Sequence, residues 1–273
     1  MKTGVELIHE MNTCVLAQGE MAFWWLGQLG YAVKIGETII YIDAYLSEND
    51  DRTIAPLLKP EEVTNADFFF GTHDHEDHID RGVWGQLSIS SPNAQFIVSE
   101  LIRSRLSAEL NIPEDRFIGL DHLTSMEIGD LKITGIASAH EFLDQDKETG
   151  IYPYLGYIIE GNGCSFYHSG DTCIYPELLP VLKKWKPFHV IFVPINGRDA
   201  IRYESGCIGN MTYQEAVDLV GNLKPILAVP GHYEMFSSNS ENPWLFANYL
   251  RVKYPDVNCW IGSHGDKVTI SNK

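Results

Sequence analysis

Gly71-Thr72-His73-Asp74-His75-Glu76-Asp77-His78-Ile79-Asp80 is the most informative segment of the chain. It follows the apolar strand Asp67–Phe70, so a polar loop begins where a buried strand ends. Three imidazoles and several carboxylates this close together are costly to bury unless a cation neutralises the carboxylates and satisfies the ring nitrogens. Imidazole nitrogens and carboxylate oxygens are typical ligands of divalent ions. The segment therefore predicts a metal site rather than a solvated polar turn.

The spacing of these side chains predicts ligands for two neighbouring ions. In an extended loop His73 and His75 point to the same side, because successive side chains alternate. Asp77 and His78 begin a turn toward a different side. One short segment can therefore contribute ligands to two adjacent ions.

This segment resembles the signature of the metallo-β-lactamase superfamily, and the rest of the chain supplies further elements in that family's order. Asp43 ends the strand Thr38–Ile42 and matches the early aspartate that supports the histidine loop. Three later residues also match: His140 after the strand Leu131–Ala137, Asp171 in His168-Ser169-Gly170-Asp171-Thr172, and His232 in Pro230-Gly231-His232. The resemblance covers roughly residues 22–264, and it implies an α/β fold, the αββα sandwich, with the site at one edge between the sheets.

The resemblance also implies a ligand set and a mechanism. The implied ligands are His73, His75 and His140 for one ion, Asp77, His78 and His232 for the other, and Asp171 as the bridge. The two divalent ions would be Zn or Mn, and Fe also suits carboxylates in a flexible geometry. A hydroxide shared by the ions would be the nucleophile, because a metal lowers the pKa of bound water toward ~7. Asp77 or Asp171 would then relay a proton to the leaving group.

Further motifs resemble one branch of this superfamily, the L-ascorbate-6-phosphate lactonase group. They are Met21-Ala22-Phe23-Trp24-Trp25-Leu26-Gly27, the segment from Thr72 to Asp80, Tyr167-His168-Ser169-Gly170-Asp171, Asn196-Gly197-Arg198, Met211-Thr212, Pro230-Gly231-His232-Tyr233-Glu234-Met235-Phe236 and Asn239. This resemblance implies a lactonase that opens a cyclic ester of a small anionic metabolite, similar to a phosphorylated sugar acid. The chain departs from that group around His140 and at Gly206-Cys207-Ile208-Gly209, so the substrate itself is not carried over.

Three residues are expected to bind the substrate by analogy with that group: Asn196, Arg198 and Tyr233. Arg198 would hold an anionic group, because a guanidinium offers a planar fork of donors. The alternative interpretation is that Arg198 pairs with one of the many acidic side chains of the chain and is structural.

Length, charge and cysteine pattern restrict the remaining function classes. The 273 residues fit one large α/β domain, 1–273, with no Pro- or Gly/Ser-rich linker. The net charge of −17 makes an extended nucleic-acid surface unfavourable. No CxxC pair occurs among the five cysteines, so a thiolate zinc site is not indicated. No segment approaches the ~20 apolar residues of a membrane span.

The first ten residues lack the apolar core of a signal peptide, so a cytoplasmic protein without membrane contact is expected. The resemblance further implies association into a homo-oligomer.

Short β-branched and aromatic runs alternate with helical patterns, which favours a layered α/β architecture. The expected strands are Phe23–Leu26, Tyr31–Ile35, Thr38–Ile42, Phe68–Gly71, Gln95–Val98, Leu131–Ala137, Tyr154–Glu160, Cys164–Tyr167, Val190–Val193, Ile226–Val229 and Lys267–Ile270. The expected helices are Glu100–Leu110, Pro176–Lys184, Tyr213–Leu223 and Trp244–Lys253. Thr212 followed by Glu215 predicts a capping box at the start of the third helix.

Two other functions compete with the lactonase. A phosphodiesterase or nuclease would use the same dinuclear site, but the acidic charge and the lack of a Lys/Arg-rich arm count against it. A non-enzymatic metal-binding or ligand-sensing module would need a defective ligand set, and all seven expected positions are occupied by ligand-type residues.

Overall fold

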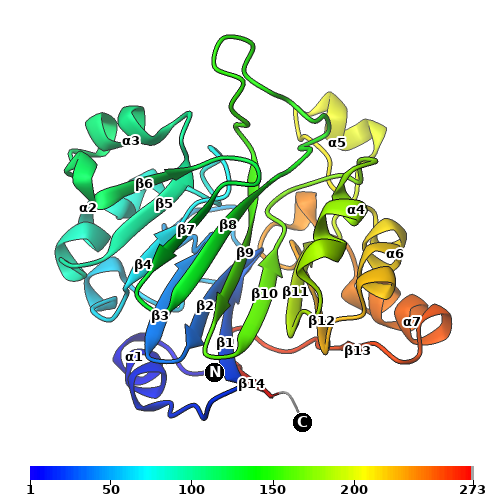
Figure 1. Cartoon of the computed structure of the whole chain (residues 1–273), viewed down its shortest axis with the longest axis horizontal. Coiled ribbons are helices and arrows are strands. Elements are labelled where there is room, and N and C mark those ends of the chain that lie inside the picture. The colour runs from blue at the N-terminus through cyan, green and yellow to red at the C-terminus, as the bar shows by residue number, and fades with distance from the viewer. Residues whose placement is uncertain (272–273) are drawn as a thin grey trace.

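The computed structural model describes residues 1–271 and contains two seven-stranded sheets packed face to face, with helices on both outer sides (Figure 1). The first sheet is built from β1 (Glu20–Gly27), β2 (Gly30–Ile35), β3 (Thr38–Ile42), β4 (Phe68–Phe70), β5 (Gln95–Ser99), β6 (Phe117–Leu120) and β14 (Lys267–Ser271). Its order is β14-β1-β2-β3-β4-β5-β6. This layering confirms the predicted αββα sandwich.

The second sheet has the order β13-β12-β11-β10-β9-β8-β7. Its strands are β7 (Ser125–Ile128), β8 (Leu131–Ala137), β9 (Leu155–Gly161), β10 (Cys164–His168), β11 (Val190–Pro194), β12 (Leu227–Gly231) and β13 (Asn258–Cys259). Both sheets are mixed. In each sheet some neighbouring strands pair antiparallel, such as β1 with β2 and β9 with β10, and others pair parallel, such as β3 with β4 and β10 with β11.

The strands read as almost continuous apolar runs because both faces of each sheet are covered. Along β1 the side chains of Phe23 and Trp25 join the core between the sheets. Their neighbour Trp24 points the other way and packs with Leu7 and Met11 of the N-terminal helix. Alternation along one strand therefore contributes to two separate apolar layers.

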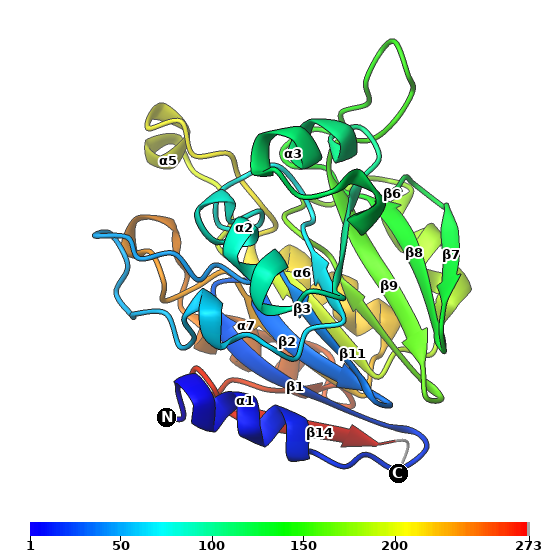
Figure 2. The same cartoon turned by 90° about the vertical axis from the view of Figure 1, so that its left-hand side faces the viewer.

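Seven α-helices lie outside the sheets in the described residues 1–271: α1 (Gly4–Thr13), α2 (Arg81–Ser90), α3 (Arg103–Leu110), α4 (Leu178–Leu182), α5 (Ala200–Glu204), α6 (Tyr213–Leu223) and α7 (Pro243–Lys253). α1, α2 and α3 cover the outer face of the first sheet (Figure 2). α4, α6 and α7 pack their buried side chains on the second sheet. None of these helices is long and apolar enough to cross a membrane.

Several strands end at the same edge of the sandwich. β3 and β4 run parallel to each other in the first sheet. In the second sheet β10, β11 and β12 are parallel, and β8 has the direction of β10 because both pair antiparallel with β9. The loops that follow these strands therefore gather their side chains at one edge, between the two sheets.

The expected elements differ from the observed ones mainly where the pattern is weak. The helix Tyr213–Leu223 and its Thr212–Glu215 capping box are confirmed. The helix predicted from Glu100 starts only at Arg103. Elements missed from the sequence are α1, α2, α5, β6, β7 and β13. β7 has only four residues and is not buried, and α2 contains two glycines, so each gives only a weak local signal.

Candidate metal centre

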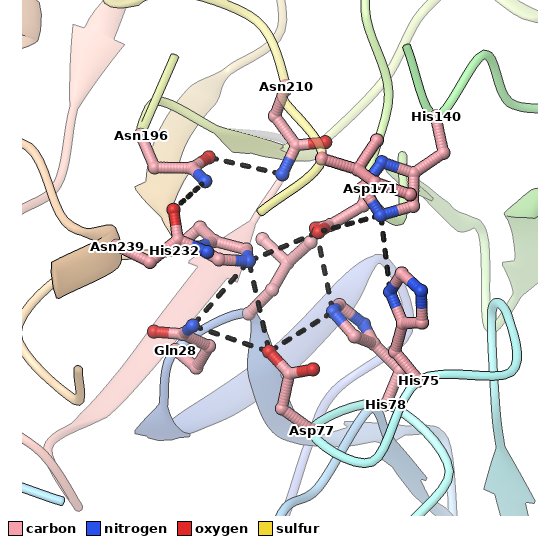
Figure 3. Close-up of polar contacts among 12 residues, drawn as sticks. Gln28, His75, Asp77, His78, His140, Asp171, Asn196, Asn210, His232 and Asn239 are labelled. Carbon is pink, nitrogen blue, oxygen red and sulfur yellow. Dashed lines mark hydrogen bonds and ion pairs between the residues drawn. The ribbon is translucent and has the colours of Figure 1, made fainter. Parts of the chain in front are cut away.

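All seven residues predicted as ligands lie together at this edge. Figure 3 labels all of them except His73. Two groups of three could each hold one ion, with ligand atoms within 4.8 Å of one another: His73, His75 and His140, and Asp77, His78 and His232. A third group, His73, His78 and Asp171, overlaps with both. The groups have the composition that the resemblance implied.

The first group presents three imidazole nitrogens to one point. His75 Nδ1 lies 2.9 Å from His73 Nε2 and 3.2 Å from His140 Nε2. Ligand atoms around a tetrahedral zinc ion are about 3.3 Å apart, given bonds of about 2.0–2.1 Å. The spacing therefore fits one ion held by three histidines.

The second group combines one carboxylate with two imidazoles. Asp77 Oδ2 lies 3.5 Å from His78 Nε2 and 3.9 Å from His232 Nε2. His78 and His232 are buried, whereas Asp77 is partly exposed at the surface of a cavity. This group is slightly wider than the first, and one ligand atom faces solvent.

Asp171 lies between the two groups. Its Oδ2 is 3.1 Å from His232 Nε2 and 3.8 Å from His140 Nε2, and its Oδ1 is 3.6 Å from His78 Nε2. One carboxylate thus contacts ligands of both groups, which is the position that a bridging ligand requires.

The donor set fits divalent cations. His78 Nε2 and Asp171 Oδ1 are buried and have no hydrogen-bond partner within residues 1–271. Leaving such atoms unpaired is unfavourable by about 1–3 kcal/mol each. The ring nitrogens of the first group also face one another, and at most one hydrogen can occupy each of those contacts. A cation in each group would satisfy all of these atoms at once.

The electrostatics of the cluster favour cation binding. Burial lowers the pKa of His140 to about 4, so its imidazole is neutral and able to coordinate at neutral pH. Burial also lowers the pKa of His73, and a protonated His78 adds to that effect. For His78, burial opposes protonation, but Asp77, Asp171 and Asp43 together raise the pKa well above its usual value. A metal ligand must be deprotonated, so a cation at His78 would compete with a proton.

Asp43, the predicted supporting aspartate, contacts the ligand loop, which is the segment 71–80 that carries four of the candidate ligands. Its Oδ2 lies 2.7 Å from His78 Nδ1 and accepts from the Thr72 hydroxyl at 2.7 Å, while its Oδ1 accepts from Thr72 N at 2.9 Å. Asp43 has φ +49° and is 1 % exposed. A carboxylate on the second imidazole nitrogen fixes the ring and raises its basicity toward a metal.

The ligand loop is held by its own backbone and by an apolar anchor. His78 N and Ile79 N both donate to His75 O, which makes a tight turn that separates the two ligand pairs. Ile79 is fully buried, and its side chain lies directly over Gly71, where a Cβ would be 2.3 Å from Ile79 Cγ1. The absence of a side chain at Gly71 and the turn at His75 therefore let β4 end and the histidines turn toward the space between the sheets within a few residues.

His168 is a structural histidine in the motif that carries Asp171. Its Nε2 donates to Leu29 O at 2.8 Å, and its Nδ1 accepts from Gly170 N at 3.2 Å. Gly170 adopts φ +58°, which favours glycine. His168 thus shapes the turn that directs Asp171 into the centre.

A cavity of about 290 Å³ opens beside the second ligand group. Its walls are formed by Gln28, Tyr45, Asn49, Glu76, Asp77, Cys207, Phe236, Ser238 and Asn239. A larger cavity of about 650 Å³ lies at the opposite end of the second sheet, around the turns that precede β8 and β10, and contains no residue of the cluster. The smaller cavity is therefore the candidate substrate site.

The three residues predicted to bind substrate do not line this cavity. The Arg198 guanidinium makes two hydrogen bonds of 2.8 Å to the Glu215 carboxylate and one to Asn210 O. Asn196 is fully buried and bonds Asn239 and Asn210 through its amide. Tyr233 is buried against Trp25, with ring centroids 4.7 Å apart. Their substrate-binding roles stay predictions.

Sequence reasoning missed several residues at the site. Gln28 lies 3.3 Å from Asp77 and occupies a Gly-Gln-Leu-Gly break between two strands, which reads only as a turn. Thr72 and Asn239 were quoted in motifs but given no role, although both contact site residues. Arg202 also contacts a site residue and belongs to no motif. Gln28 and Thr72 share one weak signal, since each is a polar residue directly beside a motif residue.

The sequence matches the family described as the beta-lactamase superfamily domain over residues 38–233. This span includes Asp43 and all seven residues of the metal cluster. The chain belongs to this superfamily. Its fold is that of the metallo-β-lactamases, and the resemblance inferred from the histidine-rich segment is confirmed at this level.

Related proteins of this superfamily match nearly the whole chain. A UPF0173 metal-dependent hydrolase of Archaeoglobus fulgidus is 27% identical over 249 residues, which cover 90% of this chain and 97% of the relative. A UPF0173 metal-dependent hydrolase of Thermococcus onnurineus is 28% identical over 229 residues, covering 84% and 92%.

Solved structures show the same fold at lower identity. Igni18, a metallo hydrolase from Ignicoccus hospitalis, superposes with a TM-score of 0.71 at 21% identity and covers 93% of this chain and 100% of its own. An isothiocyanate hydrolase from Delia radicum gut bacteria gives a TM-score of 0.68 at 14% identity, covering 92% and 99%. The chain is thus a metal-dependent hydrolase of the metallo-β-lactamase superfamily. Its assignment to the L-ascorbate-6-phosphate lactonase group stays a prediction.

Proposed function

We propose that the chain is a lactonase that opens a cyclic ester of a small anionic metabolite, similar to a phosphorylated sugar acid, with the help of two divalent ions, Zn or Mn. The observation that carries this proposal is the pair of ligand groups, joined by Asp171, beside a cavity of about 290 Å³. Divalent ions held there would activate water at neutral pH and stabilise the negative charge that develops on the ester oxygen.

The cavity favours a small substrate over a polymer. Its lining includes two carboxylates, Glu76 and Asp77, and no lysine or arginine. Phosphate backbones are held by several cationic side chains, and the net charge of −17 opposes their approach. A nuclease is therefore less well supported than a hydrolase of small esters.

Asp77 is our proposed proton carrier for the leaving group. Its carboxylate lines the cavity and is 23% exposed, while Asp171 is almost completely buried between histidines. A group that passes a proton to a departing alcohol must reach the substrate. Asp77 meets that condition, and its Oδ2 lies 3.3 Å from the Gln28 amide nitrogen.

Arg198 is the proposed contact for an anionic group of the substrate that lies away from the reacting ester. Glu215 already occupies the guanidinium fork through two hydrogen bonds. A substrate carboxylate or phosphate would therefore bind Arg198 only by replacing Glu215, and part of the binding free energy would be spent on breaking that pair.

The test is a hydrolysis screen on purified protein of known metal content. Phosphorylated sugar lactones and unphosphorylated lactones would be compared with bis(p-nitrophenyl) phosphate as a generic phosphodiester. We expect lactone opening that disappears with a chelator and returns with Zn or Mn. Hydrolysis of the phosphodiester without any lactone activity would overturn the proposal.

A further inference from the structure

Two amide side chains, Gln28 and Asn239, stand in the wall of the cavity beside the metal centre. An amide offers a carbonyl acceptor and an NH₂ donor, and its neighbours decide which end faces the cavity. For both residues a charged neighbour makes that choice.

Asn239 is the last member of a chain of three amides (Figure 3). Asn210 Nδ2 donates to Asn196 Oδ1 at 3.2 Å, and Asn196 Nδ2 donates to Asn239 Oδ1 at 2.8 Å. Asn196 and Asn210 are fully buried. Turning all three amides over would give an equally complete chain with the opposite direction, so the amides alone do not fix the orientation.

Arg202 removes this ambiguity. Its guanidinium can only donate, and Nη1 lies 3.5 Å from Asn239 Oδ1. The same nitrogen donates to Asn196 O, and Nε donates to Asp199 Oδ2 at 2.6 Å, so Arg202 itself is held in place. The Asn239 oxygen must therefore face Arg202 and Asn196. Its NH₂ group, which has no acceptor within residues 1–271, is left for the cavity.

Gln28 has the opposite orientation for the opposite reason. Its Nε2 lies 3.3 Å from Asp77 Oδ2, and an ionised carboxylate can only accept. Gln28 Oε1 is buried without a partner and points away from Asp77 (Figure 3). The backbone is fixed as well, because Gln28 O accepts from Trp25 Nε1 and from His232 N.

We infer that Gln28 and Asn239 form a subsite that binds a hydroxyl-bearing, uncharged part of the substrate. Gln28 and Asn239 line one cavity, the first with a buried acceptor that lacks a partner and the second with a free NH₂ donor. Together they match a group that both donates and accepts, and a hydroxyl is the simplest of these. Tyr45 and Phe236, with ring centroids 6.1 Å apart, add apolar surface for the carbon face of such a group. The inference rests on the proposed lactonase function and specifies that the ring carries hydroxyls near the reacting ester.

The test compares ligands that differ only in two hydroxyls. Erythronolactone and γ-butyrolactone serve as substrates, and their ring-opened forms, erythronate and 4-hydroxybutyrate, serve as binding probes for the metal-loaded protein. Calorimetry should show erythronate binding about tenfold more tightly, since two neutral hydrogen bonds are gained. Equal affinities for the two probes would overturn the subsite.

Asn239→Asp is the decisive variant. The carboxylate keeps both acceptor contacts to Asn196 and Arg202 but loses the donor toward the cavity. Any repulsion of the anionic probes is the same for both, so their affinity ratio isolates the lost hydrogen bond. We expect this ratio to fall several-fold, whereas the same substitution at the exposed Asn222 on α6 should leave it unchanged. An unchanged ratio in Asn239→Asp would also overturn the inference.

Arg202 is tested as a positioning residue by two substitutions. Arg202→Lys retains a donor-only group and should keep the probe ratio, while Arg202→Gln can also accept and should lower it. Gln28→Met, assayed with its metal content measured, should lower the ratio by removing the acceptor. If neither lactone is opened but the probe ratio responds as described, the lactonase proposal fails and the subsite stands.

Discussion

Asp43 illustrates how one side chain at this centre fixes several others. Its two oxygens accept from the backbone and hydroxyl of Thr72 and contact the ring of His78. It does so from a left-handed backbone position at φ +49°. Such positions are unfavourable by about 1–3 kcal/mol for residues other than glycine and are typical of functional sites. Orientation of the ligands therefore depends on residues that touch no metal.

Loss of a ligand and loss of its support should have different consequences. His73→Ala should remove both bound metal and activity, because His73 contributes to two of the three ligand groups. Asp43→Ala should retain measurable metal and lose activity less severely, since such supporting contacts are typically worth ~10–100-fold. Elemental analysis and hydrolysis assays on both folded variants check this order. Equal metal loss in the two would refute it.

His264 should make the stability of the protein sensitive to acid. It is buried against Trp25, and burial, followed by the nearby Arg52, lowers the pKa of His264 from 6.5 to about 4. The unfolded chain then binds a proton that the folded chain does not, so this contribution is complete above pH ~6.5 and disappears as the pH falls toward ~4. A difference of that size corresponds to about 3 kcal/mol.

Urea unfolding of chelated protein between pH 6.5 and pH 4 measures this effect. His264→Phe keeps a ring on Trp25 but cannot titrate, and its stability should fall less steeply with acid than that of the unsubstituted chain. His264→Leu serves as a second non-titrating variant. Parallel slopes in all three proteins would show that His264 contributes nothing to the acid sensitivity.

At the scale of elements, the loops after the strands are shaped by positions that only glycine fits well. Gly170 precedes Asp171 and has φ +58°. A Cβ there would lie 2.8 Å from Leu155 O and 2.8 Å from Thr72 Cβ. The turn after β10 is thus packed against the turn after β4, and each loop limits where the other can place its ligands.

Gly170→Ala should lower metal content as well as stability. The matched control is Gly129→Ala in the β7–β8 turn, where φ is +55° but no atom lies within 4 Å of the added Cβ. The control should lose only the ~1–2 kcal/mol of a left-handed alanine and keep its metal. Gly170→Ala should lose more stability and release metal, because Asp171 is displaced. Equal effects on metal content would contradict this account.

Helix α6 begins with two interactions that share one carboxylate. Glu215 completes the capping box with Thr212 and also binds Arg198. Glu215→Gln keeps the capping box and loses the charge, so the free energy of unfolding should fall by less than ~1 kcal/mol, as for exposed ion pairs. Glu215→Ala loses both and should be lower by a further ~1 kcal/mol. Urea titrations that gave both variants the same midpoint would exclude a role for the capping box.

At the scale of the whole molecule, each ligand group joins the two sheets. His73 and His75 follow β4 of the first sheet, whereas His140 follows β8 of the second. In the second group, Asp77 and His78 stand in the loop after β4 of the first sheet, whereas His232 follows β12 of the second sheet. An ion in either group would therefore connect the two halves of the sandwich.

We expect about two metal equivalents per chain and a clear loss of stability on chelation. Ligands that bind only the folded state stabilise it, by about 2.7 kcal/mol when free metal is a hundredfold above the dissociation constant. Elemental analysis of protein never exposed to chelator, with urea unfolding before and after EDTA, tests both points. His73→Ala should show a smaller effect of EDTA. A stoichiometry near zero after metal supplementation would contradict the dinuclear centre.

From the sequence we predicted most of the helices and strands that have a clear apolar run or a capping motif, and we missed those whose local pattern is weak. The apolar runs of β1 to β4 and the capped helix α6 were recognisable because burial and capping leave local signals. β6 has only four residues, and its inner Ile118 and Gly119 are half-exposed, so its pairing with β5 depends on contacts distant in sequence. Four of the candidate ligands stand in one short segment with a recognisable spacing, whereas His140, Asp171 and His232 were predicted only through the family resemblance.

The sequence alone predicted the superfamily and, through that resemblance, the αββα layering, and both are confirmed. The ligand set that the resemblance implies stays a prediction, although the residues concerned lie together. Only the tertiary structure decided which polar residues meet at the cavity. Arg198 faces Glu215, while Arg202, which belongs to no motif, contacts Asn239 in the cavity wall. The physical reason is that a hydrogen bond forms only when the donor–acceptor distance is correct to within a few tenths of an ångström, and here donor and acceptor stand in separate loops. Those distances are fixed by the packing of two sheets and not by any local pattern.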